Sequence, residues 1–356
     1  MTNEQLLDWI DKAVAQQASD LHLVTGYPAT LRIHGRLVPL GGTDVLMDED
    51  VRRVIDELCP EHLRARLATG SDLDFAVELM IGERPRRFRV NLFLAEGHWG
   101  ACLRVIAADI PNFSWAGFPQ DLAHRLIGTR NGLVLVAGVT GAGKTTTLAM
   151  LINELNQLGG KRIITVEEPI EYRFPPVQGS LVTQREVGRD VTSFADGLKF
   201  GLRQDPDVIL VGEIRDRETA QMALSAAETG HLVFSTLHTR DAKGAISRYV
   251  DLFPQSVQNE IRSLLSMSLR AIISQHLLTS SADEKRELAL EVLVNNSAIA
   301  SAIRLGKLET IDTNIQTGRN DGMVTLDESI RRLWSAGRIS QETAEQYISD
   351  RRLLKM

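Results

Sequence analysis

The sequence predicts an α/β protein in which a smaller α+β domain precedes a larger domain built on a parallel sheet. Short apolar segments that alternate with polar residues dominate the N-terminal part, whereas four longer apolar runs separated by helix-like segments follow. A glycine-rich turn connects the first of these runs to an amphipathic helix. The length of 356 residues suits two domains.

The composition excludes several classes of protein. With 43% hydrophobic and 24% charged residues, the chain can bury a large core and is not mainly disordered. Its net charge of −6 argues against a protein that coats nucleic acid, so we expect no stable binding of nucleic acid. The two cysteines are too few for a disulfide framework or a four-cysteine zinc site, and they suit a reducing cytoplasm.

Targeting signals are not expected. The N-terminal stretch carries Asp8 and Asp11 and lacks the basic and apolar regions of a secretory signal. No apolar run approaches the roughly 18 residues of a membrane-spanning helix. We therefore expect a cytoplasmic protein.

The N-terminal domain should alternate helices and strands. Leu6, Ile10 and Val14 fall at helical spacing, and the pattern between Asp20 and Leu40 changes to short strands. A second helix is expected over Asp48–Leu67. Further strands are predicted at Asp72–Leu79, Arg86–Leu94 and Gly100–Ile106.

The second domain should contain a buried parallel sheet. Its predicted strands are Leu133–Ala137, Ile163–Val166, Val208–Val211 and Leu232–Ser235. A helix is expected over Thr146–Leu158, and beyond Phe253 the pattern favours helices, with weak strand signals at Leu288–Leu293. The expected divisions are an N-terminal domain at 1–107, a proline-containing linker at 108–119, a core at 120–280 and a mainly helical region at 281–356.

A phosphate-binding loop is the strongest motif. Residues Gly138–Thr145 match G-x-x-x-x-G-K-[ST], follow an apolar strand and open a helix. Backbone N–H groups of such a loop converge on phosphate oxygens, Lys144 reaches the β- and γ-phosphates, and Thr145 offers a hydroxyl to Mg²⁺. The predicted nucleotide-binding residues are Gly138, Val139, Thr140, Gly141, Ala142, Gly143, Lys144, Thr145 and Thr146.

Two glutamates follow predicted strands and are candidates for the chemistry. Glu213 follows Val208–Val211, with Gly212 where an acidic residue is usual, and is expected to act on the metal or its waters. Glu167 follows the strand at 163–166 and is the preferred base for activating water, with Glu213 as the alternative. Each could instead be part of a solvated acidic turn.

His231 and His238 flank the fourth strand. Without nearby cysteines they do not suggest a metal site. One of the two histidines would sense the γ-phosphate or join a subunit contact, and His238 is the candidate for this role. The alternative is a packed structural histidine.

Together these residues resemble the ATPases of type IV pili and type II secretion. Glu167–Tyr172 resembles the acidic box of that family, and Gly212–Asp216 resembles its atypical Walker B motif. Thr229–Thr239 resembles its His box. Ala18–Leu23 and Arg87–Asn91 are similar to its N-terminal domain.

The resemblance implies a PAS-like N-terminal domain, a RecA-like P-loop ATPase domain and a helical C-terminal appendage. It also implies a homohexameric motor that hydrolyses ATP with Mg²⁺, in which Arg89 and Arg104 are the candidate arginines for the developing charge. The expected partners are an inner-membrane pilus platform protein and a paralogous pilus ATPase. The expected location is the cytoplasmic face of the inner membrane, at the pilus base.

Within this family the sequence is most similar to the PilT-like retraction branch. The chain lacks the four-cysteine motif that assembly ATPases often carry, and Ala298–Arg304 resembles a C-terminal motif associated with retraction. The expected function is therefore pilus retraction and twitching motility. The alternatives are a short assembly-type ATPase for pilus, secretion or DNA-uptake machinery, and a non-hydrolysing, nucleotide-gated regulatory subunit of a partner ATPase.

Overall fold

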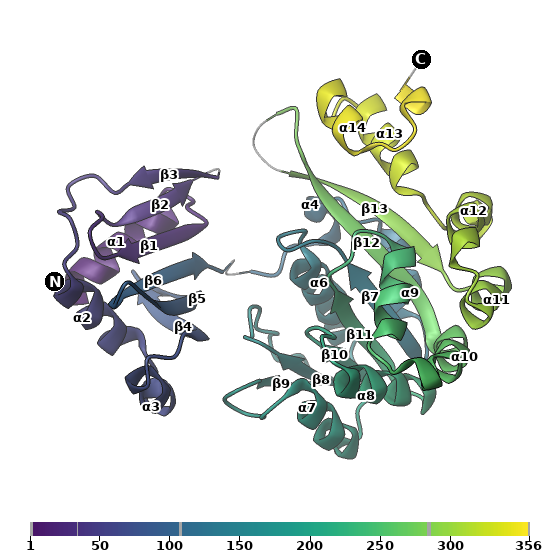
Figure 1. Cartoon of the computed structure of the whole chain (residues 1–356), viewed down its shortest axis with the longest axis horizontal. Helices are drawn as coiled ribbons and strands as arrows, with labels where there is room; N and C mark the ends of the chain where they lie inside the picture. The colour runs from purple at the N-terminus through teal and green to yellow at the C-terminus, as the bar shows by residue number, and fades with distance from the viewer. Residues whose placement is uncertain (1–2, 34, 107–108, 283–285, 355–356) are drawn as a thin grey trace. The chain divides into compact units, whose positions relative to one another are not determined.

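The computed structural model describes residues 3–33, 35–106, 109–282 and 286–354. The chain forms two compact units (Figure 1). The first unit contains Met1–Asp109 together with Glu168–Arg173, and the second contains Ile110–Glu167 with Phe174–Met356. The end of the N-terminal domain was predicted near Ala107, which lies outside the described residues.

The first unit is an α+β domain built on a six-stranded antiparallel sheet of order β3-β2-β1-β6-β5-β4. Leu6 and Ile10 of α1 and Val51 of α2 are buried in its core. The elements are α1 (Asn3–Ala15), β1 (Asp20–Val24), β2 (Thr30–Ile33), β3 (Arg36–Pro39), α2 (Asp48–Leu58), η1 (Glu61–Leu63), α3 (Arg64–Ala68), β4 (Leu73–Ile81), β5 (Arg84–Ala95) and β6 (His98–Val105).

The prediction of one helix over Asp48–Leu67 was wrong. Helix α2 ends at Leu58, and Cys59 is extended, with φ −72° and ψ 117°. Pro60 follows, and a proline lacks the N–H that a helix needs and disfavours helical backbone in the residue before it. The chain therefore leaves the helix and continues in two short pieces, η1 and α3.

The second unit contains a seven-stranded sheet of order β13-β12-β7-β11-β10-β8-β9. The four predicted parallel strands are confirmed as β7, β8, β10 and β11. The strands are β7 (Gly132–Ala137), β8 (Arg162–Glu167), β9 (Leu181–Glu186), β10 (Val208–Val211), β11 (Leu232–Leu237), β12 (Leu269–Thr279) and β13 (Arg286–Val294).

Helices cover both faces of this sheet (Figure 1). Successive side chains of β7 alternate between faces, so that Leu133 and Leu135 pack with α8 and α9, whereas Val134 and Val136 pack with α6. The helices are α4 (Phe113–Ala116), α5 (Gln120–Ile127), α6 (Lys144–Leu158), α7 (Phe194–Gly201), α8 (Arg217–Glu228), α9 (Ala242–Asp251), α10 (Gln258–Ser268), α11 (Ser297–Leu305), α12 (Ile311–Thr317), α13 (Leu326–Ser335) and α14 (Gln341–Tyr347). Short 3₁₀ turns are η2 (Leu202–Gln204), η3 (Gln255–Val257), η4 (Leu308–Thr310), η5 (Gly318–Asp321) and η6 (Arg351–Leu354).

The expectation of mostly helix after Phe253 was wrong for β12, which follows α10 directly. Strand β12 pairs in parallel with β7 and antiparallel with β13, so its two neighbours supply its backbone hydrogen bonds. Polar residues such as Arg270, Gln275 and His276 divide this segment into short apolar stretches, and the periodicity of such stretches does not distinguish a buried strand from a buried helix. The weak strand signal at Leu288–Leu293 is confirmed within β13.

The segment between the predicted domains carries its own structure. Helix α4 begins after Asn112, whose side chain accepts a hydrogen bond from Trp115 N, and Gly117 at its end has a positive φ of 69°. The Phe113 and Phe118 rings lie 5.8 Å apart and are buried in the second unit. Among the helices that the described residues form, none is long and apolar enough to cross a lipid bilayer.

A buried carboxyl group stabilises the start of α9. Glu291 Oε1 accepts a hydrogen bond of 2.7 Å from Ala242 N, the first residue of that helix. Burial raises the pKa of Glu291 from 4.5 to about 7, and the negative charges of Asp241, Asp312 and Asp327 act in the same direction. Between about pH 4.5 and pH 7, the folded state therefore keeps a proton on the Glu291 carboxyl group that the unfolded state has already released.

We predict that this group makes the protein less stable as the pH rises from about 4.5 to about 7, because the native state binds more protons in that interval. The loss should not exceed about 3.5 kcal/mol. Glu291→Gln keeps an acceptor for Ala242 N but does not ionise, so it should flatten the pH dependence. Urea unfolding at pH 5 to 8 measures this, with the exposed Glu309→Gln as control. An unchanged pH dependence in Glu291→Gln would contradict the prediction.

Candidate functional site

The phosphate-binding loop lies between the carboxyl end of β7 and the start of α6. Gly138, Gly141 and Gly143 have φ values of 152°, 78° and 84°, which favour glycine. At Gly138 an added Cβ would also lie 2.8 Å from the carbonyl oxygen of Gln275. Backbone conformation therefore favours glycine at all three positions, and at Gly138 the lack of space for a Cβ adds a second reason.

Lys144 is buried within this loop. Its Nζ donates to Gly138 O at 2.9 Å and to Val139 O at 3.1 Å. Burial lowers the pKa of Lys144, and the negative charge of Glu213 acts in the opposite direction. The ammonium group thus occupies the loop's interior, where it could exchange carbonyl partners for phosphate oxygens.

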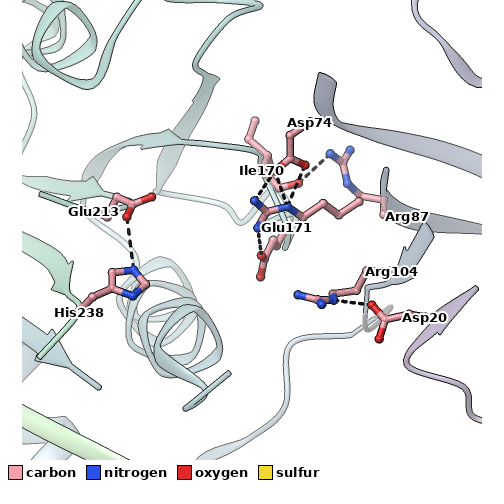
Figure 2. A network of polar contacts seen from close by, with 9 residues as sticks. Asp20, Asp74, Arg87, Arg104, Ile170, Glu171, Glu213 and His238 are labelled. Carbon is pink, nitrogen blue, oxygen red and sulfur yellow. Dashed lines mark hydrogen bonds and ion pairs between the residues drawn. The ribbon is translucent and has the colours of Figure 1, made fainter. Parts of the chain in front are cut away.

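Glu213 lies two residues beyond the end of β10. Its Oε2 atom forms an ion pair of 2.5 Å with Arg215 Nε. The same oxygen lies 3.4 Å from His238 Nε2, as Figure 2 shows. The pKa of His238 is lowered by burial and by the positive charges of Lys144 and Arg215, while Glu213 opposes that shift. The structure thus brings together Lys144, Glu213 and His238, which were predicted as site residues.

Glu167 is the last residue of β8 and is buried. Its Oε1 atom accepts hydrogen bonds from Thr165 Oγ1 at 2.6 Å and from Gln184 Nε2 at 3.1 Å. Strands β8 and β10 are parallel neighbours, and Gly212 N donates to Val166 O at 2.8 Å. Glu167 and Glu213 therefore follow adjacent strand ends, with glycine at position 212 in close contact with the β8 backbone.

A magnesium ion fits the donors at these strand ends. Among the described residues, no group of three or more His, Cys, Asp or Glu side chains could hold a metal without other ligands. Thr145 is exposed at the start of α6, and the buried Glu213 Oε2, which pairs with Arg215, would bind a metal by sharing or giving up that ion pair. A hydroxyl, a carboxylate and phosphate oxygens are the hard oxygen donors that Mg²⁺ prefers.

His231 lies at the opposite end of β11 from His238. Its Nδ1 is 2.9 Å from Ala226 O and 3.3 Å from Thr229 Oγ1. These contacts fix the turn after α8. These contacts favour the alternative stated above for His231, a packed structural histidine, over a sensor of the γ-phosphate.

The candidate arginines belong to the first unit and are paired there with carboxylates. Arg89 makes a bidentate contact with Asp74, with Nε at 3.0 and 3.1 Å from the two oxygens, and lies 3.7 Å from Glu171. Arg104 Nε donates to Asp20 Oδ1 at 2.8 Å (Figure 2).

The segment Glu168–Arg173 follows Glu167 directly but packs with the first unit. Arg87 Nη2 donates to Ile170 O at 2.8 Å (Figure 2), and Arg173 Nε lies 3.6 Å from Glu78 Oε2. The chain therefore passes from one unit to the other immediately after the candidate base.

A cavity of about 180 Å³ opens beside the phosphate-binding loop within the second unit. Most of its lining residues were not among those predicted from the sequence. Trp115, Met150, Leu277 and Leu288 form apolar parts of the lining, and Thr146, Gln275 and Arg286 contribute polar groups. The exposed aromatic residue in the proline-flanked segment was a usable signal for Trp115, whereas nothing in the sequence pointed to Gln275 or Arg286.

Known proteins resemble this chain over most of its length. Residues 3–331 match the family described as type II/IV secretion system protein. The YggR protein of Escherichia coli K12 is 41% identical over 92% of this chain and 97% of its own length. The type IV pilus retraction ATPase PilT of Pseudomonas aeruginosa is 40% identical over 93% of this chain and 94% of its own length.

Among solved structures, a crystal structure of the pilus retraction motor PilT with bound ADP matches with a TM-score of 0.86. The two chains are 40% identical, and the match covers 97% of each. The predicted combination of an N-terminal domain and a RecA-like ATPase domain is confirmed by this similarity.

We predict that Lys144→Ala lowers the affinity for ATP at least about 100-fold, because it removes the buried ammonium group that would form charge-assisted hydrogen bonds with phosphate. Titration with a fluorescent ATP analogue measures this, and circular dichroism checks the fold. The matched control is the exposed Lys199→Ala, which should bind normally. Unchanged affinity in Lys144→Ala would refute the assignment of the site.

Proposed function

The chain belongs to the type II/IV secretion system protein family, and on that premise we propose that it is an ATPase motor that powers retraction of a type IV pilus. The observation that carries this proposal is the near full-length similarity to PilT, combined with a buried Lys144 and two carboxylates at adjacent strand ends. The site contains the groups that phosphoryl transfer to water requires.

We propose that the triphosphate binds along Gly138–Thr146, with the nucleoside in the cavity beside Trp115 and Met150. Lys144 would stabilise negative charge on the β- and γ-phosphates. Thr145 and Glu213 would hold Mg²⁺, directly or through its waters. When bound, Mg²⁺ supplies positive charge that neutralises the developing charge on the phosphate oxygens.

Glu167 is the better candidate for orienting and deprotonating the attacking water. Thr165 and Gln184 fix the orientation of its carboxylate, as a general base requires. Glu213 forms an ion pair with Arg215 and follows the neighbouring strand end, which favours an electrostatic role near the metal over that of the base. His238, beside Glu213, would respond to the charge of the γ-phosphate through the same carboxylate.

Arg89 would contribute to this reaction by exchanging partners, because it is paired with Asp74 and also lies near Glu171. Arg104 contacts Asp20 through Nε, so its Nη groups could bind a phosphate while this ion pair stays closed. Loss of the phosphate on hydrolysis would let the pair of Arg89 with Asp74 form again. Such an exchange couples the chemical state of the nucleotide to the position of the first unit.

We further propose that the segment Glu168–Arg173 transmits this motion. It is held to the first unit by Arg87 and by the ion pair of Arg173 with Glu78. Because it continues directly from Glu167, displacement of the first unit would act on the strand end that carries the base.

The assembly and its partners follow from the family resemblance. We propose a homohexameric ring at the cytoplasmic face of the inner membrane, at the pilus base. Its partners would be a pilus platform protein in that membrane and a paralogous pilus ATPase. Cycles of ATP hydrolysis around the ring would then drive disassembly of the pilus and twitching motility.

Glu167→Gln should preserve ATP binding and slow hydrolysis at least about 100-fold, because the amide keeps the shape of the side chain but cannot accept a proton. Steady-state phosphate release and ATP titration measure the two quantities. The exposed Glu260→Gln on α10 is the control and should hydrolyse ATP at a nearly normal rate. If Glu167→Gln turns over normally while Glu213→Gln does not, the base is Glu213.

Deletion of the chain in its own organism tests the direction of the motor. We expect more surface pili and no twitching motility, because pili would extend without being withdrawn. Electron microscopy and a surface-motility assay measure this. Absence of pili would favour an assembly ATPase, and a complemented strain carrying Lys144→Ala should reproduce the deletion.

A further inference from the structure

The hairpin β12–β13 extends beneath the phosphate-binding loop. Strand β12 runs parallel to β7, and their last paired residues are Ser274 and Ala137. Strand β7 ends there, whereas β12 continues to Thr279. Gln275 is therefore placed where Gly138 begins the loop, and its carbonyl oxygen would be 2.8 Å from a Cβ at Gly138.

Gln275 makes one short contact with the loop. Its side chain is buried, and Nε2 donates to Ala142 O at 2.6 Å. Because a carbonyl oxygen only accepts, this contact fixes which end of the amide faces the loop. The other end, Oε1, is buried and finds no hydrogen-bond partner within the described residues.

A buried amide whose nitrogen is hydrogen-bonded but whose oxygen is not costs free energy. An apolar side chain of similar size would fill the same volume without leaving an acceptor unsatisfied. Unsatisfied groups of this kind are uncommon in folded proteins and call for a specific reason. The hydrogen bond from Gln275 Nε2 to Ala142 O explains why a glutamine, and not an apolar residue, occupies this position.

That contact controls the direction of one backbone N–H. In a trans peptide the C=O and the following N–H point in opposite directions. Holding Ala142 O against Gln275 therefore directs Gly143 N–H away from β12. Gly143 has φ +84° and precedes Lys144 at the start of α6, so this N–H belongs to the group that binds phosphate.

The other carbonyls of the loop are held in a related way. Arg286 Nη1, from β13, donates to Gly141 O at 3.3 Å. Lys144 donates to Gly138 O and Val139 O. Side-chain donors thus occupy several carbonyls of the loop, and two of these donors come from the β12–β13 hairpin.

We propose that Gln275 is a positioning residue for the nucleotide: it holds the Ala142 carbonyl so that the Gly143 N–H is presented to a phosphate group. The proposal rests on the proposed binding of ATP at this loop. It predicts that Gln275 contributes equally to the binding of ATP and ADP, since both carry the phosphates that the loop N–H groups cradle.

The test compares Gln275→Met with the matched variant Ile273→Val, which alters a buried residue of β12 that packs in the apolar core. Gln275→Met should weaken binding of fluorescent ATP and ADP analogues by the same factor, about tenfold, which corresponds to one lost hydrogen bond to a charged group. The kcat should change much less than KM, because ground state and transition state lose the same contact. Ile273→Val should bind normally.

A second variant replaces the amide with a group whose ability to donate depends on pH. In Gln275→Glu the introduced carboxyl can donate to Ala142 O only when protonated. The ratio of its ATP affinity to that of the wild type should therefore rise as the pH falls from 8 to 5.5. This measurement decides the question if Gln275→Met fails to fold.

Three results would overturn the inference: unchanged affinity in Gln275→Met, an equal loss in Ile273→Val, or a pH-independent affinity ratio in Gln275→Glu. Lys144→Ala distinguishes this failure from failure of the proposed function. If Lys144→Ala loses ATP binding while Gln275→Met does not, only the role of Gln275 is refuted. If Lys144→Ala also binds normally, the nucleotide site itself is wrong.

Discussion

The parallel register of β7, β11, β10 and β8 is the constraint on which the site depends. It brings the carboxyl ends of four buried strands to one edge of the sheet, where the phosphate-binding loop and the candidate acids follow. None of these groups could be assembled by local sequence alone. Hydrophobic burial on both faces of the sheet stabilises this register, and the polar groups at its edge are held by short contacts such as that of Thr165 with Glu167.

The chain passes between its two units at the end of β8 as well as near residue 109. Strand β8 ends in Glu167 within the second unit, and the next six residues pack with the first. In a motor protein, a chemical step must change the relative orientation of rigid domains. Here the residue proposed to act on water and the segment proposed to transmit motion are consecutive in the chain, so no long relay is required between them.

The sequence predicted the parts that depend on local pattern. The glycine-rich loop, the four parallel strands and the acids at their ends were all recognisable from spacing and residue type. Strand β12 was not, because Leu269–Thr279 has no periodicity that distinguishes a buried strand from a buried helix. The contact of Gln275 with Ala142 joins residues 133 positions apart, and Arg286 reaches Gly141 across 145 positions. Such contacts exist only once the sheet has formed.

In the proposed mechanism the strand ends of the second unit bind a nucleoside triphosphate, and water oriented by Glu167 attacks its γ-phosphate. The decisive measurement is a crystal structure of the protein with Mg²⁺ and a non-hydrolysable ATP analogue. We expect the β- and γ-phosphates to lie against Lys144 and the loop N–H groups, with an ordered water between Glu167 and the γ-phosphorus. An analogue bound elsewhere, or a γ-phosphate turned away from Glu167 with no water between them, would contradict it.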